Sequence, residues 1–285
     1  MISLLYLAFA AAQLAVWVWG WRVWARAGRP RALLLVLVPT ALLWYDNARI
    51  GLGRFIGEGD ALYALSVPAL AWHWTMLPLF VLAAGAIARS AGLVWALHPI
   101  GRAWFLTLAA ILFIVDVPYA IGVVFGQVGA FPAVELRLGC IGDAIRYTAT
   151  LTPAYFCGPE AEVYRVGPGP LVAIIMVVVV LIVGLTLWRA RGWPWLAAAA
   201  GFMLFAAAGG PAWGTYAPPV ANLGEIVFVV GLIAAAARFA PGARGGPGGG
   251  FGAAPRSGAA PRSGAGPRSS GHSSSGTSTS ARSPS

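Results

Sequence analysis

Long apolar stretches, separated by short polar connections, occupy residues 1–239 of this chain. Each approaches the length of about 20 residues that an α-helix needs to cross a bilayer. They cover residues 2–21, 31–50, 61–88, 103–127, 170–188, 194–210 and 222–239. The pattern therefore predicts an all-α fold, a polytopic transmembrane helical bundle of about seven spans.

Two of these stretches leave an alternative open. The stretch 194–210 is short, rich in alanine and ends at Gly209, Gly210 and Pro211, so a six-span bundle is the second interpretation. The stretch 2–21 has no basic residues before it and stays apolar for longer than the core of a typical signal peptide. We interpret it as a retained first span, with cleavage near Ala10 to Ala12 as the alternative.

The composition agrees with a membrane protein and explains the positive charge. Hydrophobic residues make up 59% of the chain and charged residues 10%, against about 45–50% and 25% in soluble proteins. The net charge of +10 comes from arginine alone, because the chain has no lysine. Arginines gather in connections on the cytoplasmic side of a membrane. Membrane topology therefore explains the net charge, and nucleic-acid binding is not needed to account for it.

The arginines fit a single orientation of the seven spans. With the N-terminus outside, the inner connections and the C-terminal tail hold most of the 19 arginines. An odd number of spans then places the C-terminus in the cytoplasm. The inner arginines before the tail are Arg22, Arg26, Arg29, Arg31, Arg89, Arg102, Arg189 and Arg191, and the outer ones are Arg49, Arg54, Arg137, Arg146 and Arg165.

Residues 240–285 form a separate tail of Gly, Pro, Ser and Arg, with six-residue repeats such as AAPRSG. Such a composition cannot bury enough apolar surface to fold, so the tail is expected to be disordered. One reading is attachment to anionic lipids of the inner leaflet; the other is a solubilising extension. The arginines that would carry the attachment are Arg244, Arg256, Arg262, Arg268 and Arg282.

The longest connection outside the membrane, residues 128–169, contains the only two cysteines, Cys140 and Cys157. Thiols outside the cytoplasmic membrane are oxidised, so a disulfide is expected, stabilising the loop by roughly 3 kcal/mol. Two unpaired buried thiols are the alternative. A zinc site would need further ligands nearby.

The richest mixture of charges lies at the outer end of the second stretch, within residues 44–60. Asp46, Asn47, Arg49 and Glu58 are candidate substrate-binding residues, and Asp46 can pair with Arg49 because they are three residues apart on a helix. An ordinary interfacial connection is the alternative. The glycines between residues 51 and 59 resemble a phosphate cradle only superficially, since the strand and the Gly-Lys-Ser/Thr ending are missing.

Two ionisable residues fall near the middle of predicted spans, where such residues are costly and usually functional. His73 lies halfway along the third stretch, and Asp116 lies in the fourth, before Pro118. We expect them to form a pair that acts in catalysis or proton exchange. Alternatively, each satisfies backbone groups that a neighbouring proline leaves free.

Glu225, in the last stretch, would complete this outer site if the seventh helix packs against the second. Its alternative is a helix-start carboxylate, with Asn222 as the N-cap. His98, before Pro99, indicates a turn. No set of residues predicts a metal site, because three convergent ligands are needed, and the residues indicate no cofactor class.

Seven spans with an outer N-terminus invite comparison with rhodopsins, but retinal attachment needs a lysine and the chain has none. Abundant Ala, Gly, Pro and Arg without Lys indicate a GC-rich bacterial genome, and hence the bacterial cytoplasmic membrane. The expected function is small-molecule or lipid handling at a polar site that opens outward. The rival is a non-catalytic accessory subunit of a membrane complex, whose small residues near Gly85 and Gly231 pack against a partner.

Overall fold

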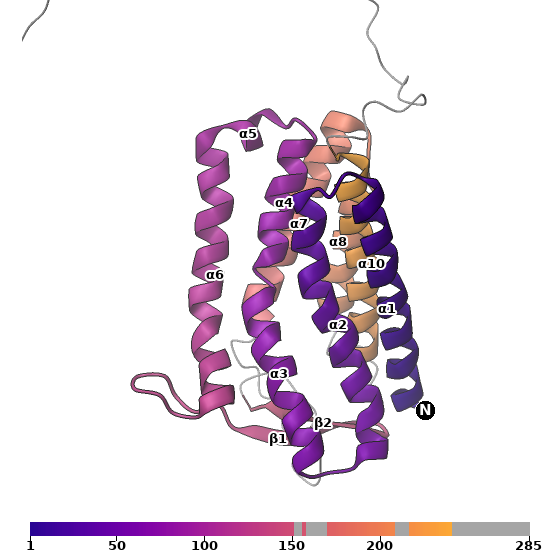
Figure 1. Cartoon of the computed structure of the whole chain (residues 1–285), viewed down its shortest axis with the longest axis vertical. Coiled ribbons are helices and arrows are strands. Elements are labelled where there is room, and N and C mark those ends of the chain that lie inside the picture. Colours follow the sequence, from indigo (N-terminus) through magenta and orange to yellow (C-terminus); the bar gives the residue numbers. More distant parts are fainter. Residues whose placement is uncertain (151–155, 158–169, 209–216, 241–285) are drawn as a thin grey trace, which may run out of the picture. The chain divides into compact units, whose positions relative to one another are not determined.

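The computed structural model describes residues 1–150, 156–157, 170–208 and 217–240, and they form a mostly helical bundle (Figure 1). The predicted tail 240–285 therefore lies outside the described residues from residue 241 onwards, as does much of the loop 128–169. The helices are α1 (Ile2–Arg26), α2 (Arg31–Ile56), α3 (Asp60–Met76), α4 (Leu79–Ser90), α5 (Val94–Leu97), α6 (Pro99–Phe125), α7 (Pro170–Arg191), α8 (Trp195–Ala208) and α10 (Ala217–Arg238).

Six helical segments in this described part are long and apolar enough to cross a membrane. One of them, Asp60–Ser90, consists of α3 and α4 joined at Leu77 and Pro78. The remaining predicted stretch, 194–210, contains α8, whose 14 residues extend about 21 Å against a hydrocarbon core of about 30 Å. A multi-pass membrane protein is therefore supported, while the count of seven spans stays a prediction.

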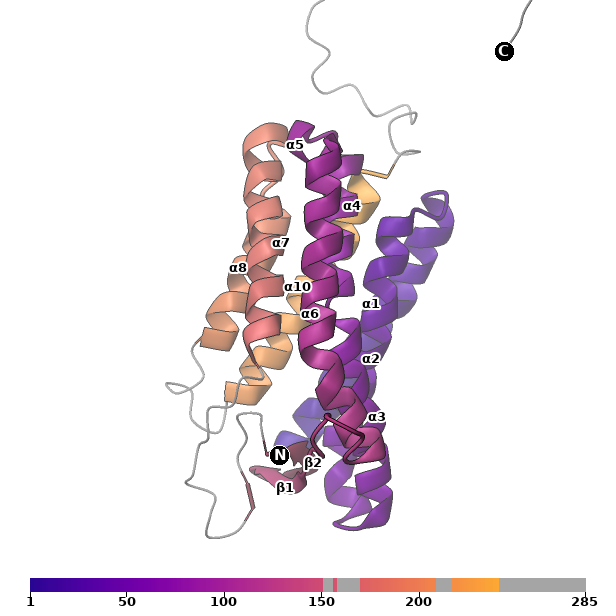
Figure 2. The same ribbon diagram turned by 90° about the vertical axis from the view of Figure 1, so that its left-hand side faces the viewer.

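The long helices run alternately up and down the bundle (Figures 1 and 2). The two ends of the bundle differ in the side chains that they carry. At one end, four helices finish with Arg26, Arg89, Arg191 and Arg238 in their last turns. Arginines there also interact favourably with the negative ends of the helix dipoles. We call this the arginine-rich end, and the opposite one the hairpin end.

The hairpin end carries a feature that the all-α prediction missed. Strands β1 (Leu136–Ile141) and β2 (Ala144–Ala149) pair antiparallel, with Ile141 opposite Ala144. A two-residue turn joins them, and its Gly142 has a φ of 59°, as hairpin turns of this length require. The Cys140–Cys157 disulfide is present and ties the segment around Phe156 to β1, which confirms the predicted pairing.

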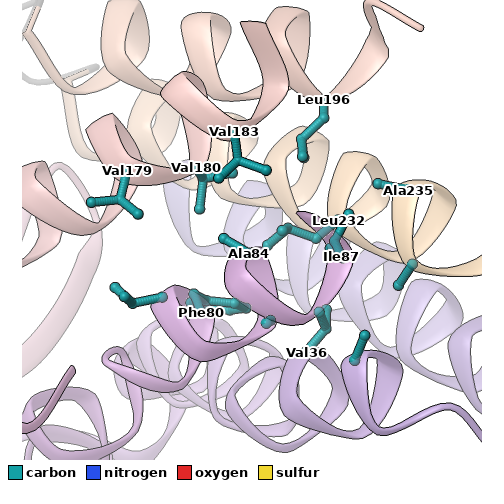
Figure 3. Close-up of a cluster of buried hydrophobic side chains, with 14 of the residues drawn as sticks. Val36, Phe80, Ala84, Ile87, Val179, Val180, Val183, Leu196, Leu232 and Ala235 are labelled. Atoms are coloured by element: carbon teal, nitrogen blue, oxygen red, sulfur yellow. The ribbon is translucent and has the colours of Figure 1, made fainter. Parts of the chain in front are cut away.

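The main core lies between α2, α4, α7, α8 and α10, with α6 contributing Phe105, and consists mostly of aliphatic side chains together with Phe80 and Phe228 (Figure 3). Small residues let these helices approach closely. A Cβ on Gly85 would lie 2.6 Å from the Phe105 ring, and one on Gly231 would lie 2.5 Å from the Ala199 Cβ. Both glycines named above for partner packing therefore face neighbouring helices of this same chain.

Candidate functional site

Arg49 holds the hairpin end together through its two terminal nitrogens, whereas its Nε is buried and has no hydrogen-bond partner among the described residues. Its side chain is 1% exposed and forms a salt bridge with Asp46 one helical turn earlier. Its Nη1 also donates to Ser66 Oγ of α3 at 2.8 Å and to the Tyr147 carbonyl of β2 at 3.0 Å. The predicted Asp46–Arg49 pairing is confirmed, and the guanidinium joins α2, α3 and the hairpin.

A second junction forms around Asp143 in the hairpin turn. Its carboxylate accepts hydrogen bonds from the N-terminal ammonium of Met1, the Ile2 amide and Arg54, while Ser3 Oγ donates to its carbonyl. The bond from the ammonium, with a smaller contribution from Arg54, lowers the pKa of Asp143 well below its usual range. These contacts dock the hairpin against the first turn of α1 and the end of α2.

Between α1 and α2, buried polar side chains are only partly satisfied. Asn47 Nδ2 donates to Gln13 Oε1 at 2.8 Å and to the Leu43 carbonyl at 3.0 Å. Asn47 Oδ1, Gln13 Nε2 and the Tyr6 hydroxyl are buried and have no hydrogen-bond partner among the residues that the structure describes. Unpaired buried polar atoms of this kind cost about 1–3 kcal/mol each and usually mark the place of a water molecule or ligand.

Three titratable side chains from different helices lie around this polar core. Asp46 of α2 is within electrostatic range of His73 of α3 and of Glu225 of α10. Gln13 lies beside Glu225, although its Nε2 does not reach the geometry of a full hydrogen bond. Asp46 has 22% of its side chain exposed, and His73 and Glu225 are also partly exposed.

Arg146 of β2, which the sequence places only in an outer connection, belongs to this region too. It is within electrostatic range of Tyr6, Asp46, His73 and Glu225. Its guanidinium is partly exposed and forms no ion pair or hydrogen bond with any residue that the structure describes. Among the described residues, Arg146 is thus a cation near the polar core without a bonded partner, whereas Arg49 is bonded to Asp46, Ser66 and Tyr147.

Asp116 and Glu58 lie apart from this group. Asp116 is 5% exposed in α6, and within the described part of the chain it makes no hydrogen bond or ion pair with His73. Their neighbours Trp74 and Tyr119 contact each other instead. Glu58 is exposed in the connection between α2 and α3. The structure therefore gathers Asp46, Asn47, His73 and Glu225, but not the predicted His73–Asp116 pair.

The remaining sequence-based alternatives are resolved by helix boundaries. Because α10 begins at Ala217, Glu225 lies two turns inside the helix, and Asn222 donates to the Pro218 carbonyl rather than acting as an N-cap. The helix-start alternative for Glu225 is therefore wrong.

His98 accepts a hydrogen bond from the Ile100 amide as the N-cap of α6, which confirms the predicted turn. In the described ranges, no group of three or more His, Cys, Asp or Glu is placed to hold a metal ion.

Comparison of the chain with protein-family models, curated proteins and solved structures gives no match. The site must therefore be interpreted from its own chemistry. In the described part of the chain, it offers carboxylates, an imidazole, an amide pair and the unpaired guanidinium of Arg146 within a helical bundle.

Proposed function

We propose that this protein crosses the bacterial cytoplasmic membrane seven times and binds a small polar molecule, or the headgroup of a lipid, in a pocket that opens on the outer side. The N-terminus and the hairpin face outward in this proposal, and the tail faces the cytoplasm. The arginine-rich end supports the orientation, because none of the nine acidic residues of the chain lies in the connections at that end.

One observation carries this proposal: among the described residues, buried polar atoms of Gln13, Asn47 and Tyr6 have no hydrogen-bond partner, and Gln13 lies beside the Glu225 carboxylate. Asp46 lies ten residues before the end of α2, about 15 Å along the helix. Charged side chains at such depth normally face a partner or water, since exposure to lipid is costly. Partial exposure of Asp46, His73 and Glu225 therefore supports a hydrated space among the helices.

The arrangement of charges suggests what the ligand looks like. Arg146 is free to bind an anionic group such as a carboxylate or phosphate, for which guanidinium geometry is well suited. Asp46 and Glu225 can accept hydrogen bonds from hydroxyl or amino groups, and Gln13 Nε2 can donate one. A small molecule with an anionic group at one end and hydroxyl or ammonium groups at the other fits this pattern. In this proposal His73 exchanges a proton with it.

A high-resolution structure of the full chain in lipid nanodiscs tests this proposal. We expect non-protein density between Arg146, Glu225 and the Gln13–Asn47 pair, and the loss of most of that density in Arg146→Gln. Arg137→Gln, on the neighbouring strand of the hairpin, is the matched control and should keep the density. If there is no density between these side chains and they bond only to each other, the proposal is wrong and the charges only stabilise the fold.

A further inference from the structure

A second feature, remote from the polar pocket, lies at the arginine-rich end. A groove of about 820 Å³ runs between α8 and α10, with small and aliphatic residues along most of its length. Ala198, Val230, Gly231 and Ala234 line it, and Trp195 and Arg238 lie at its mouth. The groove is therefore apolar along its length and cationic at one end.

The groove lies between two helices, α8 and α10, that pack closely against each other. Ala199 would meet a Cβ on Gly231 at 2.5 Å, and Trp195 and Leu196 lie near the same glycine. The backbones of α8 and α10 thus approach each other closely on the inner side. On the outer side, the lining residues Ala198 and Val230 are exposed, so the apolar surface of the groove faces the lipid phase.

The mouth of the groove resembles the interface of a membrane. Trp195 is 65% exposed, and tryptophan prefers the level of lipid headgroups. The Arg238 guanidinium is exposed and has no bonding partner in the described part of the chain. It can form two parallel charge-assisted hydrogen bonds with a phosphate.

We propose that this groove binds an anionic phospholipid, whose acyl chain lies along Ala198, Val230 and Ala234 while its phosphate binds Arg238. An apolar chain with an anionic group at one end matches the distribution of apolar surface and charge in the groove. A transmembrane helix of another protein would not need the free guanidinium. Basic pockets between helices on the cytoplasmic side commonly hold anionic headgroups, and other arginines at this end favour an anionic over a zwitterionic lipid.

Lipid retention measured by native mass spectrometry tests the site. The full chain is reconstituted with equal amounts of phosphatidylglycerol and phosphatidylcholine, extracted in mild detergent, and its bound lipids are counted. We expect the wild type to prefer phosphatidylglycerol roughly fivefold. Arg238→Gln should abolish the preference, and Ala198→Trp, which fills the groove, should reduce retention of both lipids.

Arg102→Gln is the control, because it removes an exposed arginine at the same end from α6, outside the groove. It should retain lipid as the wild type does. The proposal is overturned if Arg238→Gln keeps the wild-type preference, if Arg102→Gln loses as much of it, or if a polypeptide is bound in place of lipid. The elution volume in size-exclusion chromatography and the helical circular dichroism signal verify that each variant is folded. If Ala198→Trp does not fold, the lipid preference of Arg238→Gln alone tests the proposal.

Discussion

Single glycines determine how closely the β-hairpin approaches the bundle. A Cβ added to Gly53 would lie 1.8 Å from the Ile145 carbonyl oxygen, which is backbone and cannot rotate away. Gly53 thus allows β2 to lie directly on α2, where Arg49 can reach the Tyr147 carbonyl. The position of Arg146 over the polar core depends on this contact.

We expect Gly53→Ala to destabilise the protein by about 1–3 kcal/mol, the usual cost of overpacking. The loss should appear as a lower midpoint of thermal unfolding in detergent. Gly201→Ala is the control, because Gly201 also lies within a helix and has no heavy atom within 4 Å of an added Cβ. It should be neutral or slightly stabilising. Equal midpoints for Gly53→Ala and the wild type would show that the hairpin does not need this close approach.

At the residue scale, sequence spacing predicted local pairs better than distant ones. The Asp46–Arg49 pair follows from helical periodicity and was predicted. The grouping of Arg146 with Glu225 and His73 joins a strand and two helices that are far apart in the sequence, so no local pattern could reveal it. The three-residue spacing did not show that Arg49 would also bond Ser66 and Tyr147.

At the scale of elements, the hairpin is held to the helices by a small ionic junction around Asp143. The pKa of this carboxyl is lowered in the folded protein. Its contribution to stability is therefore complete above the unfolded pKa of about 3.9 and is lost as the pH falls toward the lower folded value. Acidification below about pH 4 should loosen the hairpin before it affects the apolar core.

Asp143→Asn should have a similar effect at neutral pH. We expect faster tryptic cleavage at Arg137 and Arg146, because the hairpin opens more often when its junction is weakened. The midpoint of thermal unfolding should fall below that of the wild type at pH 7, and the difference should narrow as the pH falls below about 4. Glu58→Gln removes an exposed carboxylate at the same end and should change neither property. Identical cleavage rates for Asp143→Asn and the wild type would contradict a structural role of the junction.

Long helices could be predicted from the sequence because their apolar runs exceed any other element in length. The all-α prediction left the hairpin out, because the two cysteines are the more prominent feature of residues 128–169. The signal was nevertheless there: a Gly-Asp turn at Gly142 and Asp143 between two short runs rich in β-formers. The start of α10 was placed five residues too late because its first turn holds Pro218 and Pro219, and proline is well tolerated there.

At the scale of the whole molecule, charge is sorted along the bundle. Arginines collect at the end without acidic residues, whereas the carboxylates, the disulfide and the hairpin lie toward the other. This sorting favours one orientation in the membrane, and the two proposed ligand sites lie at opposite ends of it, the polar pocket toward the hairpin end and the apolar groove at the arginine-rich end. The proposed pocket is the central claim. If water fills it, the protein can bind a ligand there; if the pocket is dry, the charged side chains only stabilise the fold.

Chemical labelling of a cysteine at His73 tests this claim most directly. Both native cysteines are joined in the disulfide, so His73→Cys supplies the reactive thiol, and Trp72→Cys, at a side chain 51% exposed on the bundle surface, supplies a lipid-facing control at the same depth. A cationic, membrane-impermeant thiol reagent is added to intact cells. We predict that His73→Cys is labelled at least about tenfold faster than Trp72→Cys, because thiols ionise and react in water but not in lipid. Equal rates, or labelling of His73→Cys only after the membrane is opened, would contradict an outward-opening hydrated pocket.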